Sequence, residues 1–246
     1  MYFDLVGGIE LTASAGIVIA ILAAGLSETW RTRAAIAAGF GAWFSMVTAL
    51  AATEAFHQAG SAGLLGLGTA VFLPVAVMVG AAIWSDRVRE AIQRIPLSSL
   101  VAVNTVRILG VSFVMLYALG RLPAPFAPVA GWGDIAVGLT APLVAWLIAT
   151  RGAAARSVLV IWNAVGLADL IVAVGLGVTS APGPLQLIGS GAGSGLMTTL
   201  PWLLIPGFLV PTLACTHLAV FYRLRAGVEP VAEAAGRQPS TVTATL

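Results

Sequence analysis

Seven apolar stretches, each close to the length of a transmembrane helix, follow one another along the 246 residues of this chain. An α-helix needs about 20 residues to cross the hydrocarbon core of a bilayer. Only 9% of the residues are charged and the mean hydropathy is +0.99, whereas about a quarter of the residues of a soluble domain are charged. The sequence therefore predicts an all-α, polytopic membrane helix bundle.

The predicted spans are joined by short connections and form one transmembrane domain over residues 1–225. Residues 226–246 are rich in Ala, Pro and Thr without periodicity, which predicts a disordered cytoplasmic tail. The spans are placed at Leu5–Leu26, Ala34–Phe56, Leu64–Trp84, Ser98–Leu119, Asp134–Thr150, Ser157–Val178 and Leu200–Tyr222.

Arginines are concentrated on one side of this predicted bundle. Short loops make successive spans antiparallel, so the ends of the first, third, fifth and seventh spans lie on the same side. The arginines that follow those spans are Arg31, Arg33, Arg87, Arg89, Arg94, Arg151, Arg156, Arg223 and Arg225. The opposite side has Arg121. The positive-inside rule then predicts an external N-terminus and a cytoplasmic C-terminus.

Three segments depart from plain apolar helix. Between Asp86 and Ile95, apolar residues recur at helical spacing opposite arginines, which predicts a short helix in the cytoplasmic headgroup layer. Arg121–Gly133 contains three prolines and predicts a stiff, non-helical outer cap. In the last span, prolines at positions 201, 206 and 211 predict a kinked or broken helix, and such helices often border transporter binding sites.

Counting about 1.5 Å per residue from the span ends estimates the depth of each polar side chain. Two residues, Arg107 and Asp169, are expected near the midplane. The inner third is expected to hold Asn104, Asn163 and His217. The outer layer is expected to hold Glu10, Glu54, His57, Arg121 and Asp134.

The central feature is Arg107, because a guanidinium at the bilayer centre costs from about 3 to more than 10 kcal/mol. Asp169 has the opposite charge at a similar depth, so an ion pair between the two is expected, with Asn104 on the same helical face as Arg107. One hypothesis is that these residues hold helices together. The other is that they form a substrate or proton pathway, whose candidate residues are Arg107, Asp169, Asn104, Asn163, His217 and Asp134.

The outer layer suggests a second kind of site. Glu54 and His57 are three residues apart on one helical face, and Glu10 and Asp134 are expected at similar depth. Carboxylates with one imidazole suit iron, manganese or zinc. The alternative is a water-filled vestibule in which Arg121 pairs with one carboxylate. A di-iron bundle would need a second Glu-x-x-His, and the sequence has none.

The strings RLPAPFAPVAGWGD, NAVGLADL and LPWLLIPGFLVP resemble segments of bacterial seven-span proteins usually labelled hypothetical. The resemblance covers about the C-terminal half of the chain. It implies a bacterial inner membrane and transfers no functional residues. Matching features of the first three and last three spans also suggest a 3+1+3 parallel repeat, with the fourth span as linker.

Three function hypotheses follow. The first is a transporter or permease for a small solute, proton-coupled through the polar midplane site. The second is a membrane-embedded metal-binding or redox enzyme, and the third is a non-catalytic subunit, assembly factor or sensor; the sequence favours a non-enzymatic role. No cofactor is expected apart from the metal of the second hypothesis, and the absence of lysine excludes a retinal Schiff base. The expected partners are the lipid bilayer and a small-molecule or ion substrate, with a homo-oligomer or larger membrane complex left open and no nucleic acid.

Overall fold

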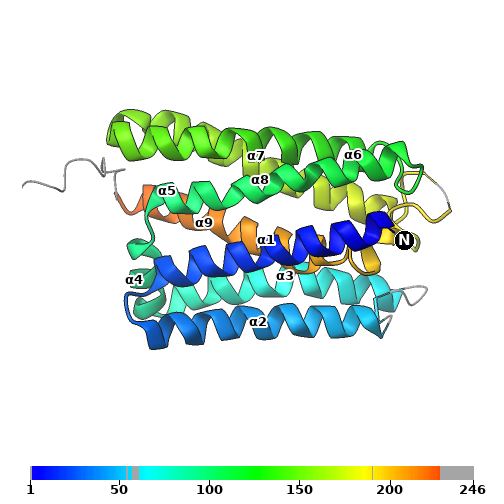
Figure 1. Cartoon of the computed structure of the whole chain (residues 1–246), viewed down its shortest axis with the longest axis horizontal. Coiled ribbons are helices and arrows are strands. Elements are labelled where there is room, and N and C mark those ends of the chain that lie inside the picture. Colours follow the sequence, from blue (N-terminus) through cyan, green and yellow to red (C-terminus); the bar gives the residue numbers. More distant parts are fainter. Residues whose placement is uncertain (1, 54, 57–60, 190, 228–246) are drawn as a thin grey trace, which may run out of the picture.

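The computed structural model describes residues 2–53, 55–56, 61–189 and 191–227, and within these ranges it contains helices and no strand. The long helices run nearly parallel to the long axis of the molecule (Figure 1). The α-helices are α1 (Tyr2–Leu26), α2 (Trp30–Ala52), α3 (Ser61–Trp84), α4 (Asp86–Arg94), α5 (Leu97–Ala102), α6 (Val111–Ala118), α7 (Phe126–Arg151), α8 (Arg156–Ser180) and α9 (Val210–Arg225). The 3-10 helices are η1 (Val103–Gly110), η2 (Gly152–Ala155) and η3 (Gly195–Thr198), and η4 (Ile205–Leu209) is a π-helix.

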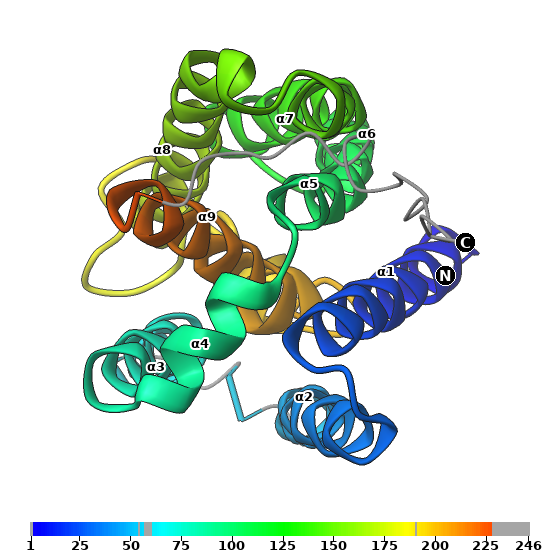
Figure 2. The same cartoon turned by 90° about the vertical axis from the view of Figure 1, so that its left-hand side faces the viewer.

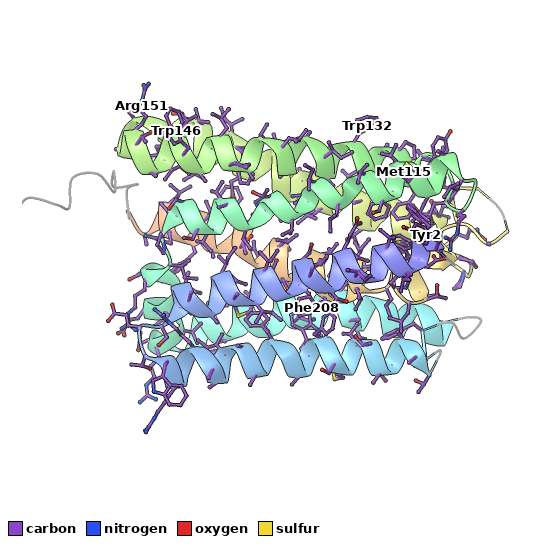
Figure 3. All side chains as sticks on the ribbon, viewed as in Figure 1. Tyr2, Met115, Trp132, Trp146, Arg151 and Phe208 are labelled. Carbon is purple, nitrogen blue, oxygen red and sulfur yellow. The ribbon has the colours of Figure 1, made fainter. Side chains whose placement is uncertain are left out.

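Among the residues that the structure describes, five helical runs are long and apolar enough to cross a membrane, or six if α3 and α4 are taken together as one bent span. Their outward faces carry large apolar side chains. On the outer face of α7, for example, Trp132 is 62% exposed and Trp146 is 55% exposed (Figure 3). Exposing so many large apolar side chains to water is unfavourable, whereas lipid tails would contact them without a free-energy cost. The all-helical fold and its apolar exterior are typical of a membrane protein.

The last helix lies in the centre of the bundle. Figure 2 shows α9 with α5, α7 and α8 on one side and α1, α2 and α3 on the other. The preceding residues are equally central, since Trp202 and Phe208 are completely buried. Leu200–Pro201 is a cis peptide bond, and η4 begins only at Ile205. The expectation of an irregular last span is confirmed, although its regular α-helix starts later than predicted.

The fourth predicted span is one helical run from Leu97 to Ala118, but its middle third is the 3-10 helix η1. Long 3-10 stretches within a helix are uncommon and often mark a hinge or local strain. The whole run packs along α7 rather than standing apart from its neighbours. The 3+1+3 repeat stays a prediction.

Helix α4 lies across one end of the bundle, after a bend of 106° from α3 (Figure 2). Ser85 caps its N-terminus by accepting a hydrogen bond from the amide of Val88. The predicted short helix is therefore confirmed. The same end contains the C-terminal ends of α1, α7 and α9, and Arg151 points outward from it, while the N-terminus lies at the opposite end (Figures 1 and 3). We call it the arginine-rich end.

The prediction of a non-helical cap over Arg121–Gly133 is wrong for most of that segment, because α7 already begins at Phe126. Pro125 is the N-cap residue and Pro128 lies in the first turn. A proline there removes only an amide that has no partner within the helix, so it does not disrupt the helix. The early start places Asp134 inside α7, two turns beyond its N-terminus. Of the predicted cytoplasmic tail, all but Ala226 and Gly227 lies outside the described residues.

Candidate functional site

The most highly connected polar side chain is that of Arg107, in η1. Its Nε donates a 2.7 Å hydrogen bond to Oδ1 of Asp134 on α7, and its Nη2 donates to Oδ2 of Asp169 on α8. Nη1 donates to the carbonyl oxygen of Gly166, at 2.9 Å, and lies 3.3 Å from Nε2 of His217 on α9. The predicted Arg107–Asp169 ion pair is confirmed. One guanidinium thus connects η1 with three other helices.

The three charged residues, which we call the ion cluster, are Arg107, Asp134 and Asp169. One positive and two negative formal charges give the cluster a net charge of −1 when both carboxylates are ionised. The guanidinium is enclosed, since Arg107 is only 3% exposed. The Asp134 and Asp169 side chains are 15% and 13% exposed. A buried excess charge is strongly unfavourable unless a cation or a proton neutralises it.

His217 is completely buried and acts as a hydrogen-bond acceptor for the cluster. A guanidinium can only donate, so Nε2 of His217 must accept from Arg107, and the ring proton must then be on Nδ1. Nδ1 lies 2.8 Å from Oδ1 of Asn163, which accepts that proton's hydrogen bond. Asn163 Nδ2 in turn donates to the backbone oxygen of His217, at 3.0 Å. This ring of bonds fixes a neutral imidazole and orients it toward Arg107.

Asn104 lies one helical turn before Arg107 and is also buried. Its Nδ2 donates to the hydroxyl of Thr216, at 3.2 Å, and to the carbonyl oxygen of Leu100, at 3.0 Å. Its Oδ1 is buried and has no hydrogen-bond partner among the described residues. Asn104 therefore extends the polar interior by one turn toward the arginine-rich end without contacting the charges directly.

Glycines permit the close helix packing that brings these groups together. The carboxylate of Asp169 lies directly against the backbone of Gly133, the residue before Asp134, where any side chain would overlap it. A Cβ on Gly138 would collide with the backbone of η1, lying 2.8 Å from the carbonyl carbon of Arg107. A Cβ on Gly166 would lie 2.5 Å from Cε1 of His217. The site thus depends on α7 and α8 presenting bare backbone to the cluster.

A small cavity of about 30 Å³ adjoins the ion cluster, and Arg107 and Asp134 form part of its wall. Leu11 of α1 contributes, and so do residues of η1 and η4, neither of which is an α-helix. One water needs about 10–15 Å³ of such space, so the cavity has room for about two waters but not for an organic solute. It lies where the helical backbone is least regular.

Asp134 lies beside Arg107, and the prediction that it belongs to the outer layer is wrong. It was assigned to the outer layer because its helix was expected to begin at residue 134, and the true start at Phe126 puts it beside Arg107. Arg121 does pair with a carboxylate near the N-terminal end, but that carboxylate belongs to Asp4, at 2.8 Å. Asp4 also accepts a 2.9 Å hydrogen bond from the indole of Trp202.

The other residues of the suggested metal site are not brought together by the described structure. Glu54 and His57 lie outside the described residues, and Glu10 is exposed on α1. Within the described ranges, no three His, Cys, Asp or Glu side chains are grouped as a metal ion would require. Asp134, the fourth member of the suggested site, is bound to Arg107 instead.

The residue pattern alone predicts no role for Thr216 or for the glycines at the cluster. The available signals were Gly133 and Gly138 on α7 and Gly166 on α8, since small residues mark close helix contacts. Glycine is frequent in this chain, however, and spacing alone does not say which glycines touch another helix. Gly39 and Gly175, for example, face open space.

The fold and the site together define an all-helical protein with membrane-length helices and a buried network of ionic and hydrogen-bonding groups. More particularly, the chain belongs to the family described as a domain of unknown function, DUF8737, which matches residues 64–225. That region contains every member of the ion cluster. No curated protein and no solved structure matches the chain.

Proposed function

We propose that this protein is a proton-coupled transporter for a small solute, and that Asp134 and Asp169 bind the coupling proton. The observation that carries the proposal is that two carboxylates on neighbouring helices share one buried guanidinium. With one proton bound, the cluster is neutral. Without it, the cluster has an excess negative charge in an apolar interior, which favours rearrangement or solvation.

The proposed arrangement has seven spans in a bacterial inner membrane, with α7 and α8 crossing separately and the arginine-rich end in the cytoplasm. Each of these two helices has enough residues to cross, with 26 in α7 and 25 in α8. Asp169 is then about 20 Å from the Arg156 end of α8 and about 17 Å from the Ser180 end, at 1.5 Å per residue. A proton bound there is near the middle of the membrane.

The irregular backbone around the cavity supports a role that involves conformational change. In η1 and η4 the ordinary α-helical hydrogen-bond pattern is interrupted, and both border the cavity next to Asp134. Helices interrupted in this way frequently border the substrate and ion sites of transporters. A change in the charge of the cluster would therefore act next to backbone that departs from regular α-helix.

A second cavity suggests the chemical class of the solute. It has a volume of about 70 Å³ and shares Phe113, Ile205 and Val210 with the cavity at the ion cluster. Its lining is apolar, so it favours a small uncharged solute over an ion. Because the two cavities share these three side chains, a solute bound in the second cavity would affect the packing beside the ion cluster and so its protonation.

One observation favours the third hypothesis, a non-catalytic membrane subunit. Arg107 is enclosed, and four of the five N–H groups of its guanidinium have an acceptor in this structure. A cluster so fully paired can serve to hold η1, α7, α8 and α9 together. An experiment must therefore separate proton binding from structural support.

The test is made in proteoliposomes containing a pH-sensitive dye, to which small uncharged solutes are added one at a time. The wild-type protein should give solute-dependent proton movement, and Asp134→Asn and Asp169→Asn should abolish it while remaining folded. Glu10→Gln, which neutralises an exposed carboxylate outside the cluster, is the matched control and should transport normally.

Infrared spectroscopy provides the second readout, independent of the solute. One protonated carboxylic acid should titrate in the wild-type protein, and its carbonyl band should vanish in either single variant. Solute-driven proton movement that persists in Asp169→Asn would refute the proposal. A folded wild-type protein that neither moves protons nor shows the titrating band would support the structural role instead.

A further inference from the structure

A groove opens at the arginine-rich end of the bundle, between α3, α4 and α9. Its volume is about 290 Å³, and its walls are almost entirely apolar. Ile83 from α3, Ile92 from α4, and Leu218 and Phe221 from α9 are among the lining residues. An open apolar groove of this volume matches a hydrocarbon chain rather than a polar solute.

Positive charge lies at the end of this groove. Arg225 is exposed, forms part of its lining, and forms no ion pair with any described carboxylate. Arg89 donates hydrogen bonds to the backbone oxygens of Ala82 and Ile83, at 3.0 and 2.7 Å. Both of those residues line the groove, so these bonds hold a second guanidinium at its edge, where its Nη2 also forms an ion pair with Asp86.

We propose that this groove binds an anionic phospholipid, with an acyl chain between the helices, the phosphate against Arg225, and Arg89 at the edge of the same site. Arginine binds phosphate well because its planar group of N–H donors matches the phosphate oxygens. Basic pockets between helices are a recurring form of site for anionic lipid headgroups. Helix α4, which carries Arg89, lies across the bundle end where α9 ends at Arg225, so both arginines would lie at the depth where headgroups are found.

The single cysteine of the chain makes the proposal testable. Cys215 lies in the wall of the groove and is partly exposed, so a small uncharged maleimide can report its accessibility. Delipidated protein in detergent is labelled while phosphatidylglycerol or phosphatidylcholine is added. Phosphatidylglycerol should slow labelling roughly fivefold at a concentration about four times its Kd, because protection grows as 1 + [L]/Kd. Phosphatidylcholine should slow it far less.

Two substitutions that each remove one positive charge distinguish binding at this groove from a general effect of charge at this end of the bundle. Arg225→Gln should lose the protection by phosphatidylglycerol. Arg151→Gln, at the same end but on α7 and away from the groove, should keep it (Figure 3). Native mass spectrometry of the same samples should count one anionic lipid fewer on Arg225→Gln.

Equal protection by both lipids would overturn the proposal, and so would protection that survives Arg225→Gln. If Arg225→Gln does not fold, as judged by size-exclusion chromatography, Arg225→Lys replaces it. That variant keeps the positive charge and loses the planar donors, so its protection should weaken; unchanged protection would contradict the proposed phosphate contact.

Discussion

Replacing the two aspartates of the ion cluster by asparagine, singly and together, should have non-additive effects on stability. The size of the effect depends on whether a carboxylate remains to balance the charge of Arg107. In Asp134→Asn or Asp169→Asn, one carboxylate still balances Arg107, and the asparagine can still accept a hydrogen bond. The loss is then one charge-assisted contact, about 1 kcal/mol net.

The double substitution should behave differently. It leaves the guanidinium of Arg107, which is 3% exposed, without any counter-charge. Removing the partners of a buried charge typically costs about 3–5 kcal/mol. The double variant should therefore be less stable than the sum of the two single effects by about 1–3 kcal/mol, which is the coupling energy expected of groups that share one charge.

Thermal unfolding of the detergent-solubilised proteins is the assay. For a chain of this length, a change of 1 kcal/mol shifts Tm by roughly 2–4 °C. Each single variant should thus lose about 2–4 °C and the double variant about 6–20 °C. Additive effects would refute the shared-charge argument, as would a single variant that loses as much as the double one.

Three further substitutions and one control test other parts of the structure by thermal unfolding. Gly138→Ala should lower the stability by about 1–3 kcal/mol because its Cβ meets the fixed backbone of η1. Gly175 faces open space, so the control Gly175→Ala should be neutral or stabilising by up to about 1 kcal/mol. Equal effects of the two substitutions would contradict the described contact. Asn163→Leu should cost about 1–3 kcal/mol because it leaves the buried Nδ1 proton of His217 without an acceptor, and an unchanged Tm would mean that the ring proton is elsewhere. Arg121→Gln breaks a partly exposed ion pair and should cost less than about 1 kcal/mol, with a difference from wild type that shrinks as salt is added; a loss as large as that of Gly138→Ala would be inconsistent with that exposure.

The part of the site that could be predicted is the part determined by electrostatics. Arg107 and Asp169 are costly in an apolar run, and their opposite charges and similar depths were enough to predict that they meet. The amphipathic pattern after Trp84 likewise predicted α4, because arginines and apolar residues alternate there at helical spacing.

The location of Asp134 could not be predicted because it depended on where a helix begins. Three prolines suggested that the segment before it is not helical, but proline at a helix N-terminus costs little, and α7 starts eight residues before Asp134. A shift of eight residues is about 12 Å along a helix, enough to move a side chain from the surface to the middle of the bundle. The 3-10 geometry of η1 had no signal in the residue pattern, and that stretch packs closely along α7.

The placement of Trp202 bears on how much of the chain is needed to shield the charged interior. Its ring stacks on Phe3, with centroids 5.5 Å apart, and its indole N–H is bound by Asp4, while Leu11 closes one side of the cavity beside Arg107. Phe3, Asp4 and Leu11 all belong to α1, which precedes the region matched by the family. A protein truncated to residues 64–225 would retain every charged member of the cluster but would expose it through the gap that α1 leaves.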